Sequence, residues 1–299
     1  TGKRLVKEER ADIYLREAKD AYQELAQILG RAFQFDKPML RLFSDNGIRQ
    51  AWQKRLNDPA YQDYIGDRLT AEESGYPAGG FLQKQTGYLA TGPLLDSLRD
   101  WLVAKEAYAA RPFHYDELEL NEQLHWQGVT AGQIIFCEGA RVMNNPWFNT
   151  LPMQPAQGEI MTLQAQSVLP KWIINGGKWL LPITDGRFKL GATYVWPKKE
   201  RPLDEKITNE GKRELLAALP ALLPGVKDYV VIEHAVGIRP NSLDKHPLIG
   251  FHAQHRNLAV FNGFGSKGSL LIPYYSKHFA DVLLNGTPIE PDVDIRRTA

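Results

Sequence analysis

Cysteine is nearly absent from this chain, since Cys137 is the single one among 299 residues. One cysteine excludes an intrachain disulfide and a multi-cysteine zinc site, and we expect no bound metal. The setting of Cys137, IIFCEG, predicts a small residue buried on a strand rather than a reactive thiol.

Long apolar runs and a net charge are also missing. No segment approaches the roughly 20 apolar residues that span a bilayer, and the first residues, TGKRLVKEER, lack the apolar core of a signal peptide. The 36 Lys and Arg residues nearly balance the 35 Asp and Glu residues, so no electrostatic field favours nucleic acid or an anionic membrane. We therefore expect a reducing, cytoplasmic setting.

The two ends of the chain carry mixed helix and strand signals. Apolar spacing predicts helices over residues 8–30 and 91–107, and strands over 118–126 and 132–140, the second buried and parallel. Residues 31–80 are irregular and charged, with a short helix around QAWQKRL. A strand over 229–238, a strand over 257–261 and a last helix that ends near Leu284 complete the pattern.

The middle of the chain has a different character. Between residues 152 and 232, strand-like runs are separated by Asn175-Gly176-Gly177 and by Asp185-Gly186. Such turn residues between alternating runs favour hairpins, so we expect an antiparallel sheet. Together the pieces predict an α/β plus antiparallel β fold in two domains, with a chain that crosses between them several times.

A glycine-rich loop, FNGFGSKGSLL, follows the apolar run LAVF near the end of the chain. Its spacing, G-x-G-x-x-G, imitates a dinucleotide-binding turn. After the following helix only TPIEPDVDIRRTA remains, which contains no buried strand and cannot complete a nucleotide-binding unit. The loop is therefore either a tight strand-to-helix turn or a helix start that stabilises negative charge nearby.

A second motif, GIRPNSLDKHPLIG, precedes this loop. Arg239 lies there between an apolar residue and a proline in a rigid loop. Either it forms a structural salt bridge, or its guanidinium grips a carboxylate through two hydrogen bonds.

The two motifs together resemble the C-terminal signature of the D-amino acid oxidase/glycine oxidase superfamily of FAD-dependent oxidoreductases. Other segments agree in consistent order along nearly the whole chain: TGKRLVK, IIFCEGA, PAQGEIM and GRFKLGATY. The resemblance implies a two-domain amine-oxidase-like fold. A discontinuous, Rossmann-like FAD domain would comprise residues 1–30, 86–150 and 233–299, and a substrate domain with a mixed or antiparallel sheet would comprise 31–85 and 151–232.

One departure from the family pattern concerns the start of the chain. The family begins with an ADP-binding strand, glycine turn and helix upstream of the T-G-[RK]-R stretch, which here occupies residues 1–4, and the first methionine is Met39. We expect the sequence to be a partial chain lacking roughly fifty residues in this unit. Expressed alone, it should then bind FAD poorly and show no yellow flavin absorbance.

The resemblance also implies roles for individual residues. Arg239 would pair with the substrate carboxylate, with Tyr194 and Ser266 also on the substrate side, and Lys189 would be the catalytic residue that promotes reaction with oxygen. Non-covalent FAD would be contacted by residues at the start of the chain, at the end of one strand and in the glycine loop: Gly2, Lys3, Arg4, Gly139, Ala140, Gly263, Phe264, Gly265, Ser266, Lys267 and Gly268.

The implied chemistry is hydride transfer from the carbon beside an amine to flavin N5, which gives an imine that hydrolyses. The partner would be a small amine or amino acid, with no nucleic acid, no membrane and no defined oligomeric state. Two alternatives stay open. One is a tRNA wobble-uridine oxidoreductase module, whose glycine loop is similar, and the other is a non-catalytic or partial family member.

Overall fold

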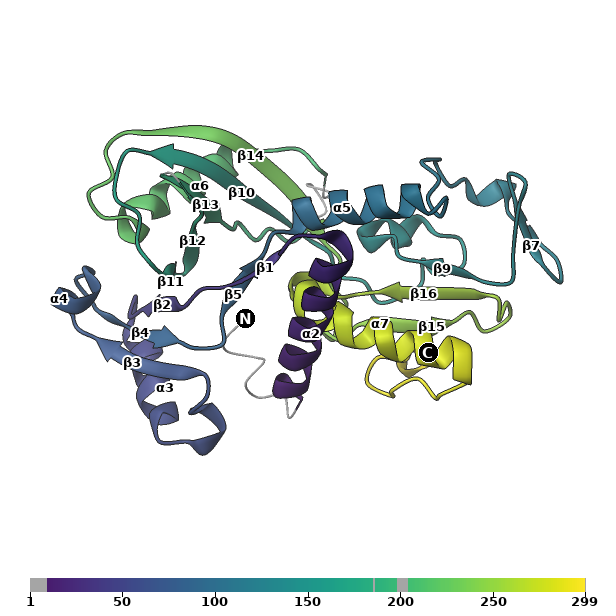
Figure 1. Ribbon diagram of the computed structural model, residues 1–299, viewed down its shortest axis with the longest axis horizontal. Helices are drawn as coiled ribbons and strands as arrows, with labels where there is room; N and C mark the ends of the chain where they lie inside the picture. Colours follow the sequence, from purple (N-terminus) through teal and green to yellow (C-terminus); the bar gives the residue numbers. More distant parts are fainter. Residues whose placement is uncertain (1–9, 185, 198–203, 299) are drawn as a thin grey trace.

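The computed structural model describes residues 10–184, 186–197 and 204–298. A large sheet occupies one side of the molecule and a small sheet with its helices the other, while helix α2 stands between them (Figure 1). The helices of at least ten residues are α2 (Ala11–Leu29), α3 (Asn46–Leu56), α5 (Thr91–Ala104), α6 (Asn209–Leu222) and α7 (Gly268–Asn285), and α4 (Ala71–Ser74) is a single turn.

The large sheet has eight strands in the order β14-β10-β13-β12-β11-β2-β4-β3. All neighbours run antiparallel except β11 and β2, which are parallel. In chain order the strands are β2 (Met39–Leu42), β3 (Ile65–Leu69), β4 (Gly80–Gln83), β10 (Ala156–Ala165), β11 (Ile173–Gly176), β12 (Lys178–Pro182), β13 (Arg187–Gly191) and β14 (Tyr229–Arg239).

Alternation along β10 explains why the sheet has one apolar face. Met161 and Leu163 are fully buried and pack with Leu215 and Leu219 of α6, since every second residue of a strand points to the same side. The predicted antiparallel block is confirmed, including the turn at Gly177, whose φ of 96° suits glycine.

Residues 31–80, expected to be irregular apart from one short helix, instead contribute β2, β3, α3 and α4 to the large sheet and its surroundings. This prediction was wrong because the strand β2 forms by pairing with β11, which lies far along the chain, and a local pattern does not show such a pairing. The sheet thus draws strands from 39–83 and from 156–239. The division into two domains stays a prediction, and its boundary at residue 232 falls within β14.

The small sheet has the order β15-β16-β9, with β9 (Ile134–Phe136) parallel to β16 (Leu258–Asn262) and β15 (Leu248–Phe251) antiparallel to it. Cys137 lies just beyond β9 and is exposed, so its predicted burial was wrong. Phe136 takes the inward position, and the next residue points outward.

The predicted strand over residues 118–126 is instead the hairpin of β6 (Glu119–Leu120) and β7 (Leu124–Trp126), extended by β8 (Val129–Ala131). A separate two-stranded ribbon joins β1 (Gln34–Asp36) to β5 (Gly87–Leu89). Three short 3-10 helices are η3 (Gly139–Asn144), η4 (Gly265–Lys267) and η5 (Ile295–Thr298).

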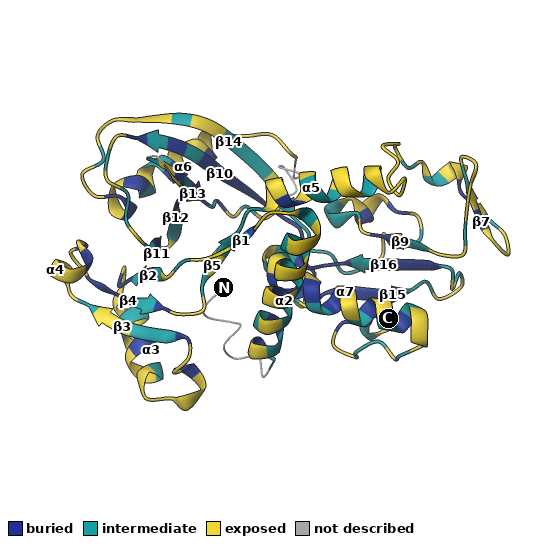
Figure 2. Ribbon diagram, in the orientation of Figure 1, coloured by how far each residue is buried: buried dark blue, intermediate teal, exposed yellow. Residues whose placement is uncertain are grey.

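Helices α2 and α7 pack against each other on the small sheet. Tyr14 and Ala18 of α2 share a buried cluster with Leu271 and Tyr275 of α7, and the hydroxyls of Tyr14 and Tyr275 are 2.9 Å apart. Dark blue buried segments follow β15, β16 and the inner side of α7 (Figure 2). As the sequence predicted, α7 ends close to Leu284, with Asn285 as its last residue and Gly286, whose φ is 72°, as its cap.

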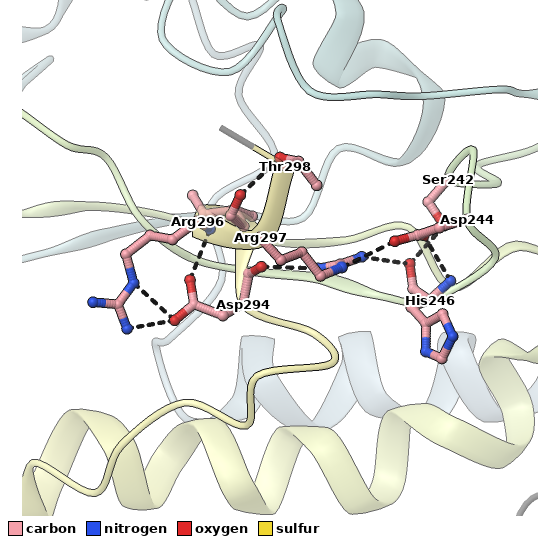
Figure 3. A network of polar contacts seen from close by, with 8 residues as sticks. Ser242, Asp244, His246, Asp294, Arg296, Arg297 and Thr298 are labelled. Atoms are coloured by element: carbon pink, nitrogen blue, oxygen red, sulfur yellow. Dashed lines mark hydrogen bonds and ion pairs between the residues drawn. The ribbon is translucent and has the colours of Figure 1, made fainter.

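The C-terminal tail is tied to the loop that follows β14. The Ile249 N–H donates to the Val293 carbonyl at 2.8 Å, and Arg297 Nε lies 2.9 Å from Asp244 Oδ2. Arg297 also donates from Nη1 to the carbonyl of Asp294 at 3.0 Å (Figure 3). These contacts therefore hold the tail in place against the side of the molecule that contains the small sheet.

This contact leads to the first prediction. Arg297→Gln is expected to lower the free energy of unfolding by about 1–2 kcal/mol, because the Arg297 side chain is 18% exposed and its loss leaves Asp244 without its cation. The control Arg213→Gln removes an exposed pair on α6 and should cost under about 0.5 kcal/mol. Urea titration measures both, and equal losses would contradict the fixed-tail account.

Candidate functional site

Arg239 ends β14, and its guanidinium contacts two backbone carbonyls and one aromatic ring. Its Nη1 donates to the Gln157 carbonyl at 3.3 Å, its Nη2 donates to the Thr193 carbonyl at 3.2 Å, and the group stands 4.8 Å from the centre of the Tyr194 ring. No carboxylate among the described residues is within ion-pair distance of it. Burial lowers the pKa of Arg239, and a nearby anion would relieve this desolvation cost.

Gly158 of β10 makes room for this guanidinium. A Cβ atom at position 158 would overlap the Nη atoms and Cζ of Arg239. The glycine of PAQGEIM is therefore required by a side chain 81 positions further along the chain, which no local pattern in the sequence could show.

Two asparagines that the sequence analysis missed join the glycine loop to its surroundings. Asn262 donates from Nδ2 to the Gly139 carbonyl at 2.8 Å, which holds the loop to the end of β9. Asn241 donates from Nδ2 to the Tyr194 hydroxyl at 3.0 Å and forms a β-bridge with Phe264. The only sequence signal for these two asparagines was their position next to Pro240 and Gly263. That signal is weak because short polar residues are common in any turn.

The first two glycines of the loop are explained by internal packing. Gly263 and Gly265 have φ values of 79° and 54°, and a Cβ at Gly265 would overlap the Asn241 side chain. The Gly265 N–H donates to the Pro240 carbonyl at 3.1 Å, so the loop lies against the Arg239 segment. Phe264 is buried against Phe261, and of this residue only the backbone remains for a cofactor.

The start of α7 lies beside this loop and has no side-chain cap. Lys267 occupies the N-cap position and no side chain caps the N–H groups there, so the positive end of this 18-residue helix lies next to the loop. Ser266 is exposed, while Gly268 is partly buried, and a Cβ there would lie close to the end of the Ile272 side chain and the Cβ of Phe264. The flavin-facing role expected of Ser266, Lys267 and Gly268 stays a prediction.

The predicted site residues do not all come together. Gly139, which opens η3, the loop of residues 263–268, Tyr194 and Arg239 form one connected cluster through the contacts above. Ala140 follows Gly139 in η3. Gly2, Lys3 and Arg4 lie outside the described residues.

Lys189 lies apart from this cluster. It pairs with Thr162 of β10 and is on the face opposite its buried neighbours Phe188 and Leu190, which is the face on which the guanidinium covers Gly158. Thr162 is four positions along β10 from Gly158, which corresponds to about 13 Å. Lys189 and Arg239 could therefore act on the same bound molecule only at different ends of it.

Two absences concern the described residues alone. No three His, Cys, Asp or Glu side chains within them gather closely enough to hold a metal ion. In the same ranges, none of the helices has both the length and the apolar content that crossing a bilayer requires.

Comparison with known families decides how the cluster is interpreted. The family model described as FAD dependent oxidoreductase matches residues 5–282. The chain belongs to this family. The resemblance drawn from the motifs is confirmed at the level of the family, and FAD is the cofactor by which the family is described.

Individual relatives are distant. The chain is 28% identical over 193 residues to glycine oxidase of Pseudomonas aeruginosa, covering 64% of this chain and 50% of that protein. It is 29% identical over 269 residues to the tRNA 5-methylaminomethyl-2-thiouridine biosynthesis bifunctional protein MnmC of Hahella chejuensis, covering 81% and 41%. The chain thus spans half or less of the length of these curated relatives.

Solved structures confirm the predicted fold class. Iminodiacetate oxidase from Chelativorans sp. BNC1 superposes with a TM-score of 0.76 at 22% identity, covering 95% of this chain and 82% of that one. At this identity the likeness establishes the architecture and leaves the chemistry to the residues of the site.

Proposed function

We propose that this protein is an FAD-dependent oxidoreductase that oxidises a C–N bond of an amino acid or a related amine carrying a carboxylate. The observation that carries the proposal is Arg239, a partly buried cation with two backbone carbonyls behind it and no acidic partner among the described residues. Such a group is completed by a carboxylate, which the guanidinium binds through two parallel hydrogen bonds.

Different residues of the chain would bind the cofactor and the substrate. FAD, when bound, would supply the acceptor for two electrons. The backbone of the glycine loop and the uncapped start of α7 would stabilise negative charge on it. Arg239 would hold the substrate carboxylate, and the Tyr194 ring, fixed through its hydroxyl by Asn241, would limit where the rest of the substrate can lie.

Lys189 would promote the reaction with oxygen, because its cationic side chain would stabilise the negative charge that develops on oxygen. Its distance from Arg239 along β10 gives it no part in holding the carboxylate. Ser266 is exposed beside the loop, open to substrate or cofactor.

A second candidate follows from the longer match to MnmC, which covers 81% of the chain. In this alternative the amine would be carried by a tRNA nucleoside instead of a free amino acid. A net charge of +1 gives little electrostatic support for binding tRNA.

One experiment separates the two candidates. The FAD-loaded protein is incubated with glycine, sarcosine, D-amino acids and proline, and in parallel with tRNA from cells that lack this protein. Hydrogen peroxide or reduced dye from an amino acid supports the first candidate. Turnover of a tRNA nucleoside alone, followed by mass spectrometry, supports the second.

A further inference from the structure

A cavity of about 800 Å³ lies at the other end of the small sheet from the Arg239 cluster. Its walls come from residues 147–151, 251–256, 282–289 and 294–298. His252, which lines it, donates its N–H to the Leu258 carbonyl at the start of β16, whereas the glycine loop leaves the far end of that strand. The cavity and the Arg239 cluster share no residue.

The walls of the cavity are already fixed in position. The tail is held by the Ile249–Val293 hydrogen bond and by Arg297, which binds Asp244 (Figure 3). On another side, the Phe148 ring meets the His252 ring edge to face with their centres 5.7 Å apart. A volume of this size with fixed walls is typical of sites for small organic molecules.

The lining combines apolar and cationic side chains. Trp147, Leu151 and Phe251 supply flat and aliphatic surface. Arg256 is exposed, and no carboxylate within the described ranges is paired with it. Asp294 is the one acid among the lining residues that the structure describes, and Arg296 already pairs with it. The lining therefore has an excess of one positive charge.

His252 adds a hydrogen-bond donor. Its Nδ1 accepts the backbone N–H groups of Gln254 and His255 at 3.2 and 3.1 Å. In the neutral ring this places the proton on Nε2, which can then donate one hydrogen bond.

We propose that this cavity binds a small aromatic anion, with the ring against Trp147 and Phe251 and the carboxylate or phosphate against Arg256. Burial of one ring and one charge-assisted hydrogen bond would together give an affinity in the micromolar to millimolar range. The site would be separate from the one proposed for the substrate carboxylate, so a ligand here would change neither the identity of the substrate nor its contacts with Arg239.

Calorimetric titration of the FAD-loaded protein with four probes tests this inference. Indole-3-acetate and adenosine 5′-monophosphate represent the two sources, an aromatic carboxylate and a nucleotide. Indole and inorganic phosphate present the ring and the charge alone. Saturable 1:1 binding of at least one of the two aromatic anions, about tenfold or more tighter than its matched half-molecule, is the expected result.

Two variants test whether the ligand binds in this cavity. Arg256→Gln removes the unpaired charge, and Ala253→Trp fills part of the space from an exposed lining position. Each should weaken binding about tenfold, while Arg213→Gln on α6 leaves it unchanged. Thermal unfolding without ligand verifies that all three variants are folded. The proposal is overturned if neither aromatic anion binds, if the neutral ring binds equally well, or if Ala253→Trp has no effect.

Discussion

Arg239→Gln is expected to lower kcat/KM for an amino acid substrate by a hundredfold to a thousandfold, about 3–4 kcal/mol. Glutamine removes the charge and one half of the paired hydrogen bonds to the carboxylate, while the Gln157 and Thr193 carbonyls stay in place. The loss should fall mainly on KM, because the carboxylate does not take part in the bond that breaks. Steady-state kinetics with the FAD-loaded protein measure it, and the proposed function underlies the expectation.

Two further variants show whether the position of the charge matters. Gly158→Ala keeps the charge and displaces it, since a Cβ at 158 would overlap the guanidinium, and about a tenfold loss is expected. Tyr194→Phe removes only the hydroxyl that accepts from Asn241 and should cost less than Gly158→Ala. A substrate analogue without its carboxyl group should lose nothing in Arg239→Gln. An equal loss for that analogue would contradict the carboxylate role.

Glu159→Leu is expected to lower the free energy of unfolding by about 3–5 kcal/mol. The Glu159 side chain is 2% exposed, and its carboxylate accepts from the Thr208 hydroxyl at 2.7 Å and the Thr208 N–H at 3.2 Å, where α6 begins. His234 Nε2 of β14 lies 2.7 Å from the Glu159 carboxylate. Leucine leaves the Thr208 hydroxyl and N–H at the helix start without their acceptor and removes the carboxylate beside His234.

Equilibrium urea unfolding of two comparison variants isolates this effect. Glu210→Gln changes an exposed carboxylate in the first turn of α6 and should cost under about 0.5 kcal/mol. Gly211→Ala introduces a Cβ that would overlap the Glu159 carboxylate, and it should destabilise in the same direction as Glu159→Leu. A loss below about 1 kcal/mol for Glu159→Leu would show that the buried carboxylate contributes little.

Local sequence patterns predicted correctly those features that depend on residues close together in the chain. The hairpin at Gly177 and the helix end at Gly286 follow from glycines that adopt positive φ, and the alternation in β10 follows from strand geometry. Arg239 and the glycine loop were recognised as motifs, and the structure brings both to one place.

The parts that the sequence could not predict depend on contacts between distant segments. Asn262 reaches Gly139 and Asn241 reaches Tyr194 only after the small and large sheets have formed. The same holds for β2, which becomes a strand by pairing with β11 more than 130 residues later. The role that the resemblance implied for Lys189 stays a prediction, and the register of β10 and β13 shows only that Lys189 lies away from Arg239.

The most direct test of the account is anaerobic reduction of the FAD-loaded protein by a panel of amino acids and amines. The account predicts loss of the oxidised flavin absorbance with at least one carboxylate-bearing amine. The rate should saturate with concentration, and in Arg239→Gln half-saturation should move to a concentration at least a hundredfold higher. If no amine or amino acid bleaches the flavin, or if Arg239→Gln is reduced at the same concentrations as the parent protein, the central claim is contradicted.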